Sequence, residues 1–381
     1  MLIYNENRHN MNMGENSSGR IISLDALRGF TIAAMILVNF PGNGKHVFPP
    51  LEHAHWNGWT PTDLIFPFFL FIVGVSIVLS LTKRKQQAIS MTPLHRKIIW
   101  RAVKIFVVGL LLNALGLIPE FHLSELRVTG VLQRIAIVYL ICSFLFLHVS
   151  IRWQVIIGAV ILVIYLIVMM FVPVPGVGIP MLEPGVNLAA WVDNHLLPGA
   201  MWQGTWDPEG ILSTFPAIAT GLTGVFAGIL LKSGQTQERK IILLFSAGFC
   251  ALILGRIWGW FFPINKNLWT SSFVLFTSGL AAMTLAVTMF ILDLLGYVRF
   301  TKPWIIFGSN AITVYVLAGI LSPFFYDLKV KGDSLNMHFF RLFTEVGLPP
   351  QLVSALYAFL YVWIIFIPAW LLYRKKIFIK L

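Results

Sequence analysis

Two histidines, an amide and a carboxylate stand close together in the stretch LEHAHWNGWTPTDLIFPFFLF, residues 51–71. An imidazole titrates near neutral pH, so His53 or His55 could take a proton from an amine or a hydroxyl, or attack an acyl group. Asn57 follows them, and Asp63 stands where a long apolar run begins. There its carboxylate could cap a helix or orient a histidine. This stretch predicts a reaction centre at the edge of a membrane segment.

Two other interpretations of the histidines stay open. They could be interface residues beside Trp56 and Trp59, which would belong to an aromatic belt at a membrane surface. They could also bind a metal together with His46 and Glu52. H-x-H alone is a weak metal signature, and no second cluster supplies further ligands, so no metal is expected.

The preceding apolar stretch, SLDALRGFTIAAMILVNF, carries Asp25, Arg28 and Asn39. On a helix, Arg28 and Asn39 would lie about 20° apart around the axis and roughly 16 Å apart along it. One face would then present a charge pair near one end and an amide near the other, which suits an extended ligand with an anionic end. The alternative is an i,i+3 ion pair in which Arg28 anchors the topology.

Further polar residues interrupt apolar runs or stand at their ends. Gln133 and Arg134 occur in GVLQRIAIVY, where a charge within a span is a functional hypothesis and snorkelling is the alternative. Asn265 and Lys266 occur in PINKNLW, and Asn310 occurs in FGSNAITVY. Helix capping would explain these three, but they are also candidates for binding a substrate or a cofactor.

The composition defines the class of protein that must position these groups. The 381 residues are 57% hydrophobic and 12% charged, whereas soluble domains carry roughly 25% charged residues. We therefore expect an all-α, polytopic integral membrane protein with about ten spanning helices. The candidate spans are 21–40, 62–82, 98–118, 129–148, 153–172, 211–231, 240–261, 269–295, 303–323 and 351–373.

The basic residues predict the orientation. With both termini in the cytoplasm, twenty of the 28 Lys and Arg residues fall on the cytoplasmic side, as the positive-inside rule requires. This distribution explains the net charge of +12 without a nucleic-acid partner. It also places the loop 41–60 on the outer face. We expect residues 1–19 to form a disordered tail and residues 20–381 to form a single domain.

Several motifs together suggest a family. SLDALRG, VNF, HAHWNGWTPTDLIFPFFLFIVG, GVLQRIAIVY, WDPEGILST, PINKNLW and FGSNAITVY occur in this order from about residue 20 onward. The chain thereby resembles the heparan-alpha-glucosaminide N-acetyltransferase family of transmembrane acyltransferases, in a bacterial form. The large luminal N-terminal domain of the eukaryotic members is not part of this sequence.

The resemblance implies a reaction and its residues. Acetyl-CoA would be supplied from the cytoplasmic side of the bacterial inner membrane, and the amine of a glucosamine-type sugar would be acetylated on the outer side. The family's active-site histidine, three residues before Trp-Asn-Gly, matches His53, and its companion Asn matches Asn39. Asp25 and Arg28 resemble the D-x-x-R-G start of related acyltransferases. A homodimer is expected by the same analogy.

The chemistry of acyl transfer agrees with these residues. It needs a base or nucleophile, a donor to the developing oxyanion and a site that excludes water. His53 could be the base or the nucleophile, and Asn39 could donate to the thioester oxygen. Arg28, Lys97 and Arg101 could hold the phosphates of CoA. Gln133 and Arg134 could contact its pantetheine or pyrophosphate.

Two other functions remain possible at this point. A secondary transporter of amino sugars or glycan fragments would also have many spans and polar groups within them, although no matching pair of broken helices is evident. An O-acetyltransferase of a surface polysaccharide would use the same donor and a hydroxyl acceptor. Both would require the lipid bilayer as their surroundings.

Overall fold

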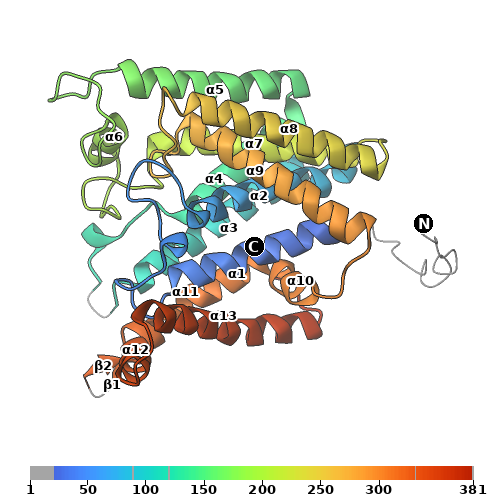
Figure 1. Ribbon diagram of the computed structural model, residues 1–381. Helices are drawn as coiled ribbons and strands as arrows, with labels where there is room; N and C mark the ends of the chain where they lie inside the picture. Colours follow the sequence, from blue (N-terminus) through green and yellow to red (C-terminus); the bar gives the residue numbers. More distant parts are fainter. Residues whose placement is uncertain (1–20, 88–89, 119–120, 331, 380–381) are drawn as a thin grey trace, which may run out of the picture.

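The computed structural model describes residues 21–87, 90–118, 121–330 and 332–379 (Figure 1). The predicted tail 1–19 lies outside the described residues. The helices are α1 (Ile22–Asn39), α2 (Pro61–Gln87), α3 (Thr92–Leu115), α4 (Val131–His148), α5 (Ile151–Phe171), α6 (Leu188–Leu196), α7 (Ile211–Lys232), α8 (Gln237–Trp258), α9 (Ser271–Met289), α10 (Lys302–Ser309), α11 (Ala311–Tyr326), α12 (Leu335–Glu345) and α13 (Pro350–Arg374). Short helical turns cover Pro49–Leu51, Leu123–Glu125 and Phe290–Leu294. Strands β1 (Lys329–Val330) and β2 (Asp333–Ser334) pair antiparallel.

Long apolar helices dominate the fold. Within the described ranges, nine helices are long and apolar enough to cross a membrane, and the bent pair α10–α11 raises the number to ten. The prediction of an all-α polytopic membrane protein is therefore confirmed, and the protein is an integral, multi-pass membrane protein. The side of the membrane on which each terminus lies stays a prediction.

The span predicted over 303–323 is divided into two helices. α10 and α11 meet at 81°, and Asn310 between them has φ −130° and ψ 41°, outside the helical region. Gly308, Ser309 and Asn310 are all poor helix formers, so the chain breaks here at little cost.

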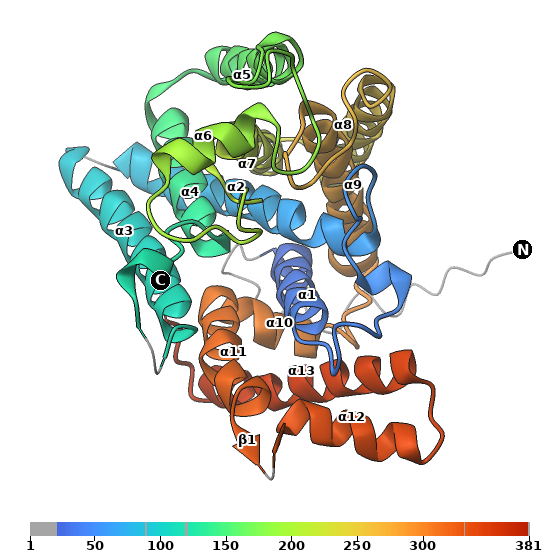
Figure 2. The same cartoon turned by 90° about the vertical axis from the view of Figure 1, so that its left-hand side faces the viewer.

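The long helices run side by side, so polar connections gather at the two ends of the bundle. The connections 40–60, 172–210 and 259–270 and the strands β1 and β2 share one end, at the left of Figure 1 and facing the viewer in Figure 2. We call this the loop-rich end. The long connections contain structure of their own, since α6 lies within 172–210 and α12 follows β2.

Glycines allow the central helices to touch. α1 packs on α10 and α2 packs on α7. A Cβ at Gly29 would overlap the carbonyl oxygen of Trp304, and one at Gly308 would overlap that of Asp25. Gly224 on α7 lies equally close to the backbone of Phe71 on α2. Small residues let membrane helices approach in this way, since packing rather than the hydrophobic effect holds them together.

We expect Gly29→Ala to destabilise the protein, because the new methyl group would force α1 away from α10. The expected loss is about 1–3 kcal/mol, measured as a lower thermal midpoint of the detergent-solubilised protein. Gly44→Ala is the matched control, because no atom lies within 4 Å of a Cβ built there. Equal midpoints for the two variants would contradict the close approach.

Candidate active site

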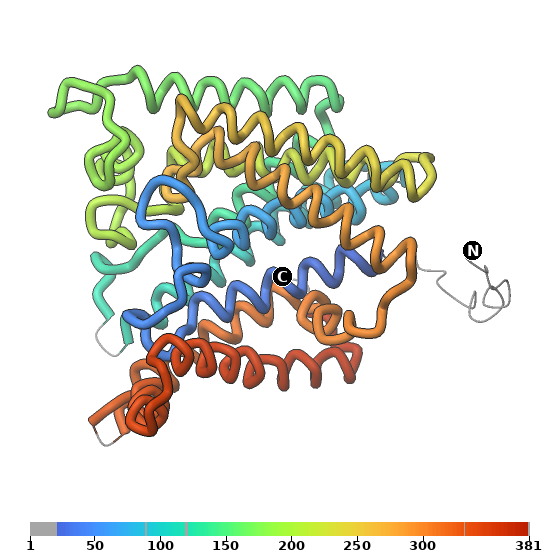
Figure 3. Tube along the Cα trace, in the orientation of Figure 1, coloured from blue at the N-terminus to red at the C-terminus, as the bar shows by residue number. Residues whose placement is uncertain are grey.

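The Asp63 carboxylate holds the end of the α1–α2 connection, which Figure 3 traces across the loop-rich end. Asp63 lies in the first turn of α2 and its side chain is 1% exposed. Oδ2 accepts from the backbone N–H groups of Ala54 and Thr60, each at 3.0 Å, and from the Thr60 hydroxyl at 3.2 Å. An acid that reaches back to the residue before its helix is a capping arrangement.

The other oxygen of Asp63 orients His53. Oδ1 lies 2.7 Å from His53 Nδ1. A carboxylate accepts, so Nδ1 carries the proton of this bond, and in the neutral ring the lone pair is on Nε2. The His53 side chain is 49% exposed, which leaves the ring open to a reactant. Asp63 therefore both caps α2 and fixes the histidine tautomer.

Lys266 completes the cluster from the connection between α8 and α9. Its Nζ lies 3.1 Å from His53 Nε2, 2.9 Å from Nδ1 and 3.7 Å from Asp63 Oδ1. Burial lowers the pKa of Lys266, and the nearby charges of Asp63 and Glu209 oppose that shift. The sequence predicted Lys266 as a polar residue at a helix end and as a candidate for binding a substrate or a cofactor. It did not predict contact with His53, because 213 residues separate the two.

Asn57 and Asn265 join the two connections that carry these groups. Asn265 Nδ2 donates to Asn57 Oδ1 at 3.1 Å, and the backbone N–H of Gly58 donates to the carbonyl of Ile264 at 2.7 Å. Asn265 Oδ1 also accepts from the N–H of Leu268 at 2.9 Å. These bonds keep the His53 loop in register with the Lys266 loop.

Two further predicted residues are exposed at this end of the protein. Asn39 is the last residue of α1, and its side chain is exposed at the loop-rich end. His55 is exposed two residues from His53. Over the described part of the chain, no three His, Cys, Asp or Glu side chains gather as metal ligands would.

A separate cavity of about 150 Å³ brings together Arg28, Asn310 and Arg101. It lies where α10 breaks into α11. Arg28 bonds Asp25 at 2.5 Å and the carbonyl of Gly308 at 2.8 Å, so the i,i+3 ion pair that the sequence offered as the alternative is present. The Asn310 amide donates to the carbonyl of Ile377 at 3.0 Å and accepts from the N–H of Ile379 at 2.8 Å.

Gln133 and Arg134 line a different cavity, of about 310 Å³. Arg134 is 1% exposed. Its guanidinium donates to Ser213 Oγ at 2.5 Å and lies 4.9 Å from the centre of the Trp269 ring. It does not snorkel to the surface, and it does not share a cavity with Arg28.

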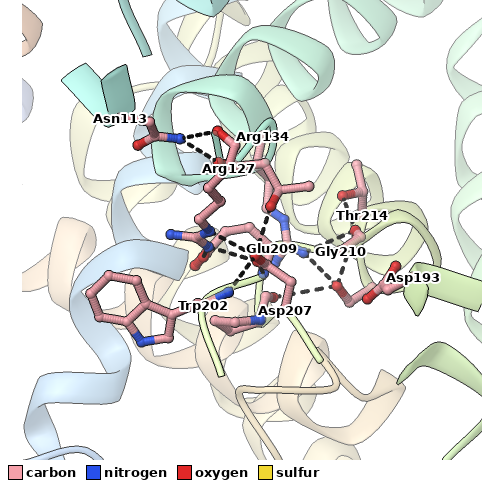
Figure 4. A network of polar contacts seen from close by, with 12 residues as sticks. Asn113, Arg127, Arg134, Asp193, Trp202, Asp207, Glu209, Gly210 and Thr214 are labelled. Carbon is pink, nitrogen blue, oxygen red and sulfur yellow. Dashed lines mark hydrogen bonds and ion pairs between the residues drawn. The ribbon is translucent and has the colours of Figure 1, made fainter. Parts of the chain in front are cut away.

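An ion-pair network beside Arg134 was not foreseen from the sequence (Figure 4). Arg127 donates to both oxygens of Asp207 at 2.6 Å and to Glu209 at 2.5 Å. Burial alone would raise the pKa of Asp207, but Arg127 and the Thr129 hydroxyl lower it. The network fixes the segment that leads into α7. The only sign of this network in the sequence analysis is the motif WDPEGILST, which contains Asp207 and Glu209.

Asp193 on α6 meets the start of α7. Its carboxylate is 1% exposed and accepts from the N–H of Ile211 at 2.8 Å. Burial raises its pKa to about 7, and the charge of Asp207 adds to the shift while the Ile211 bond opposes it.

The chain is similar to a known protein family and to two of its members. Residues 20–256 match the family described as "Heparan-alpha-glucosaminide N-acetyltransferase, catalytic". The chain is 28% identical to mouse heparan-alpha-glucosaminide N-acetyltransferase over 420 residues, and 29% identical to the human protein over 416. These alignments cover 96% and 95% of this chain, but only 61% and 60% of those proteins. The chain thus spans about three fifths of their length.

The match places the chain in a family of membrane proteins named for acyl transfer. Because the family match covers more than half of the 381 residues, the chain belongs to the heparan-alpha-glucosaminide N-acetyltransferase family. The resemblance expected from the sequence motifs is confirmed.

We expect Asp193→Asn to change the pH dependence of stability. A carboxyl whose folded-state pKa is raised to about 7 stabilises the fold at low pH. That contribution is lost as the pH rises from about 4 to about 7. The variant should therefore gain thermal stability relative to the parent across this window and differ by a constant amount above it. Parallel stability curves at all pH values would contradict the assignment.

Proposed function

We propose that the protein is a transmembrane N-acetyltransferase that moves an acetyl group from acetyl-CoA to the amine of a glucosamine-type sugar. The observation that carries the proposal is His53 held at Nδ1 by Asp63, with Nε2 beside Lys266, in a member of this family. A base with a fixed tautomer and an adjacent cation are the groups that acyl transfer from a thioester requires.

In this mechanism the sugar nitrogen attacks the thioester carbonyl. The C–N bond forms as the C–S bond breaks. His53 Nε2 takes the proton that the amine loses and passes it to the sulfur, so CoA leaves as its thiol and the neutral imidazole is restored. Lys266 lies 3.1 Å from Nε2, so the incoming amine displaces it toward the developing oxyanion. Asn39, exposed at the end of α1, is the second proposed donor to that oxygen.

The donor would enter from the other end of the bundle. Arg28, Arg101 and Asn310 line the cavity at the α10–α11 break, and guanidinium groups bind phosphate well. Helix geometry places Arg28 roughly 16 Å along α1 from Asn39. An extended thioester with phosphates at one end and an acyl group at the other fits this separation.

The orientation and assembly belong to the same proposal. The loop-rich end would face outward from a bacterial cytoplasmic membrane, since the basic residues concentrate at the other end. Residues 20–381 would act as one acyltransferase domain. The homodimer stays a prediction from the family resemblance.

One feature favours the transporter as a second candidate. A helix broken within the membrane, as at Asn310, is typical of transporters. Transporter repeats supply such breaks in pairs, and α10–α11 is the single bent pair among the described helices. Proteoliposomes that take up labelled glucosamine without acetylating it would favour this candidate, and acetylation of hydroxyls alone would favour an O-acetyltransferase.

We expect His53→Ala to reduce transfer from radiolabelled acetyl-CoA to glucosamine by about 10²–10⁴-fold, because the base is removed. The measurement uses purified protein in detergent. His55→Ala, two residues away and also exposed, should cost far less. Equal losses in both variants, or none in His53→Ala, would sink the assignment of His53. Acetyl label retained on the protein would indicate that His53 acts as a nucleophile.

Lys266→Met should lower kcat by about 10²–10³-fold, the usual effect of removing an oxyanion donor. The KM for acetyl-CoA should change little, because the proposed phosphate site lies elsewhere. Lys45→Met, at an exposed lysine in the α1–α2 connection, is the control. A change confined to KM would contradict the role of Lys266 in the transition state.

A further inference from the structure

The cavity of about 310 Å³ between α3, α4 and α7 has an apolar wall. Phe106, Ile137, Ile141 and Ile218 line it, and so does Phe215, whose side chain is 52% exposed. Because Phe215 is both exposed and part of the wall, the cavity lies at the outer surface of the bundle. On the flank of spanning helices that surface faces hydrocarbon, so an alkyl chain can enter from the side.

Donors without a hydrogen-bond partner are buried at the polar end of the cavity wall. Arg134 is 1% exposed and Gln133 is 3% exposed, and both line the cavity. Three buried nitrogen atoms have no hydrogen-bond partner among the described residues: Nε and Nη1 of Arg134 and Nε2 of Gln133. A buried cation with two unused donors is costly unless an acceptor joins it. Phosphate or ether oxygens of a ligand would supply one.

This polar end borders the candidate active site. Arg134 lies under the ring of Trp269, whose backbone N–H bonds the carbonyl of Lys266 at 3.1 Å. Glu209 lines the cavity as well.

We propose that the cavity holds the apolar chain of the acceptor, which is an amino sugar carried on a lipid-like aglycone. The chain lies against Ile137 and Phe215, Arg134 binds the oxygens that link chain to sugar, and the sugar amine reaches His53. The inference rests on the proposed acetyl transfer and names the chemical class of its acceptor.

The test compares methyl, butyl and hexyl glucosaminides as acceptors, each below its micelle-forming concentration. We expect kcat/KM to rise by at least about tenfold from methyl to hexyl, since burial of two methylene groups already accounts for that factor. A flat series, with measurable transfer to all three, would overturn the lipid-like acceptor and leave the acetyltransferase intact. No transfer to any of them would instead sink the proposed function.

Ile137→Trp tests the location by filling the cavity. It should abolish the preference for the longer chain, so that kcat/KM no longer rises from the methyl to the hexyl glucosaminide. The matched control is Ile164→Trp on α5, where the side chain is 54% exposed and the chain-length preference should persist. A preference that survives Ile137→Trp overturns the location. If that variant does not fold, Val128→Phe narrows the same cavity from its loop side.

Discussion

One buried carboxylate ties the polar connection at the loop-rich end to a spanning helix. Asp63 collects bonds from Ala54, Thr60 and His53, so it cannot be removed without freeing both the loop and the imidazole. A backbone that leaves a membrane helix must satisfy its polar groups within the protein or with water. The same bonds that meet this requirement set the tautomer of His53. Structure and proposed chemistry therefore depend on one side chain.

The remaining charges at this end are arranged around that cluster. Arg127 forms ion pairs with both Asp207 and Glu209. Arg134 lies against the ring of Trp269 with two donors unused. Paired buried charges mainly define geometry, and here they fix the segment before α7. The unpaired donors of Arg134 have no structural explanation among the described residues. A ligand that brings oxygens would provide one.

The sequence predicted the class, the spans and the His53–Asp63 relationship, because apolar runs and short separations are local signals. It also foresaw the Asp25–Arg28 pair, three residues apart on one helix. It could not bring Lys266 to His53, since only the packing of the α8–α9 connection does so. Gln133 and Arg134 were expected to bind CoA together with Arg28. In the structure they line one cavity, and Arg28 lines another. The sequence did not predict the helix break at Asn310. The low helix propensity of three neighbouring residues is a weaker signal than the apolar run around them, which predicted one continuous span.

Turnover of Asp63→Asn tests the central claim most directly. An amide at this position can donate to Nδ1, which moves the imidazole proton to Nε2 and removes the basic lone pair. The account predicts a loss in kcat of about 10³-fold or more, with acetyl-CoA still bound and the thermal midpoint little changed. Near-parental turnover by a folded Asp63→Asn protein would show that the oriented histidine is not the centre of the reaction.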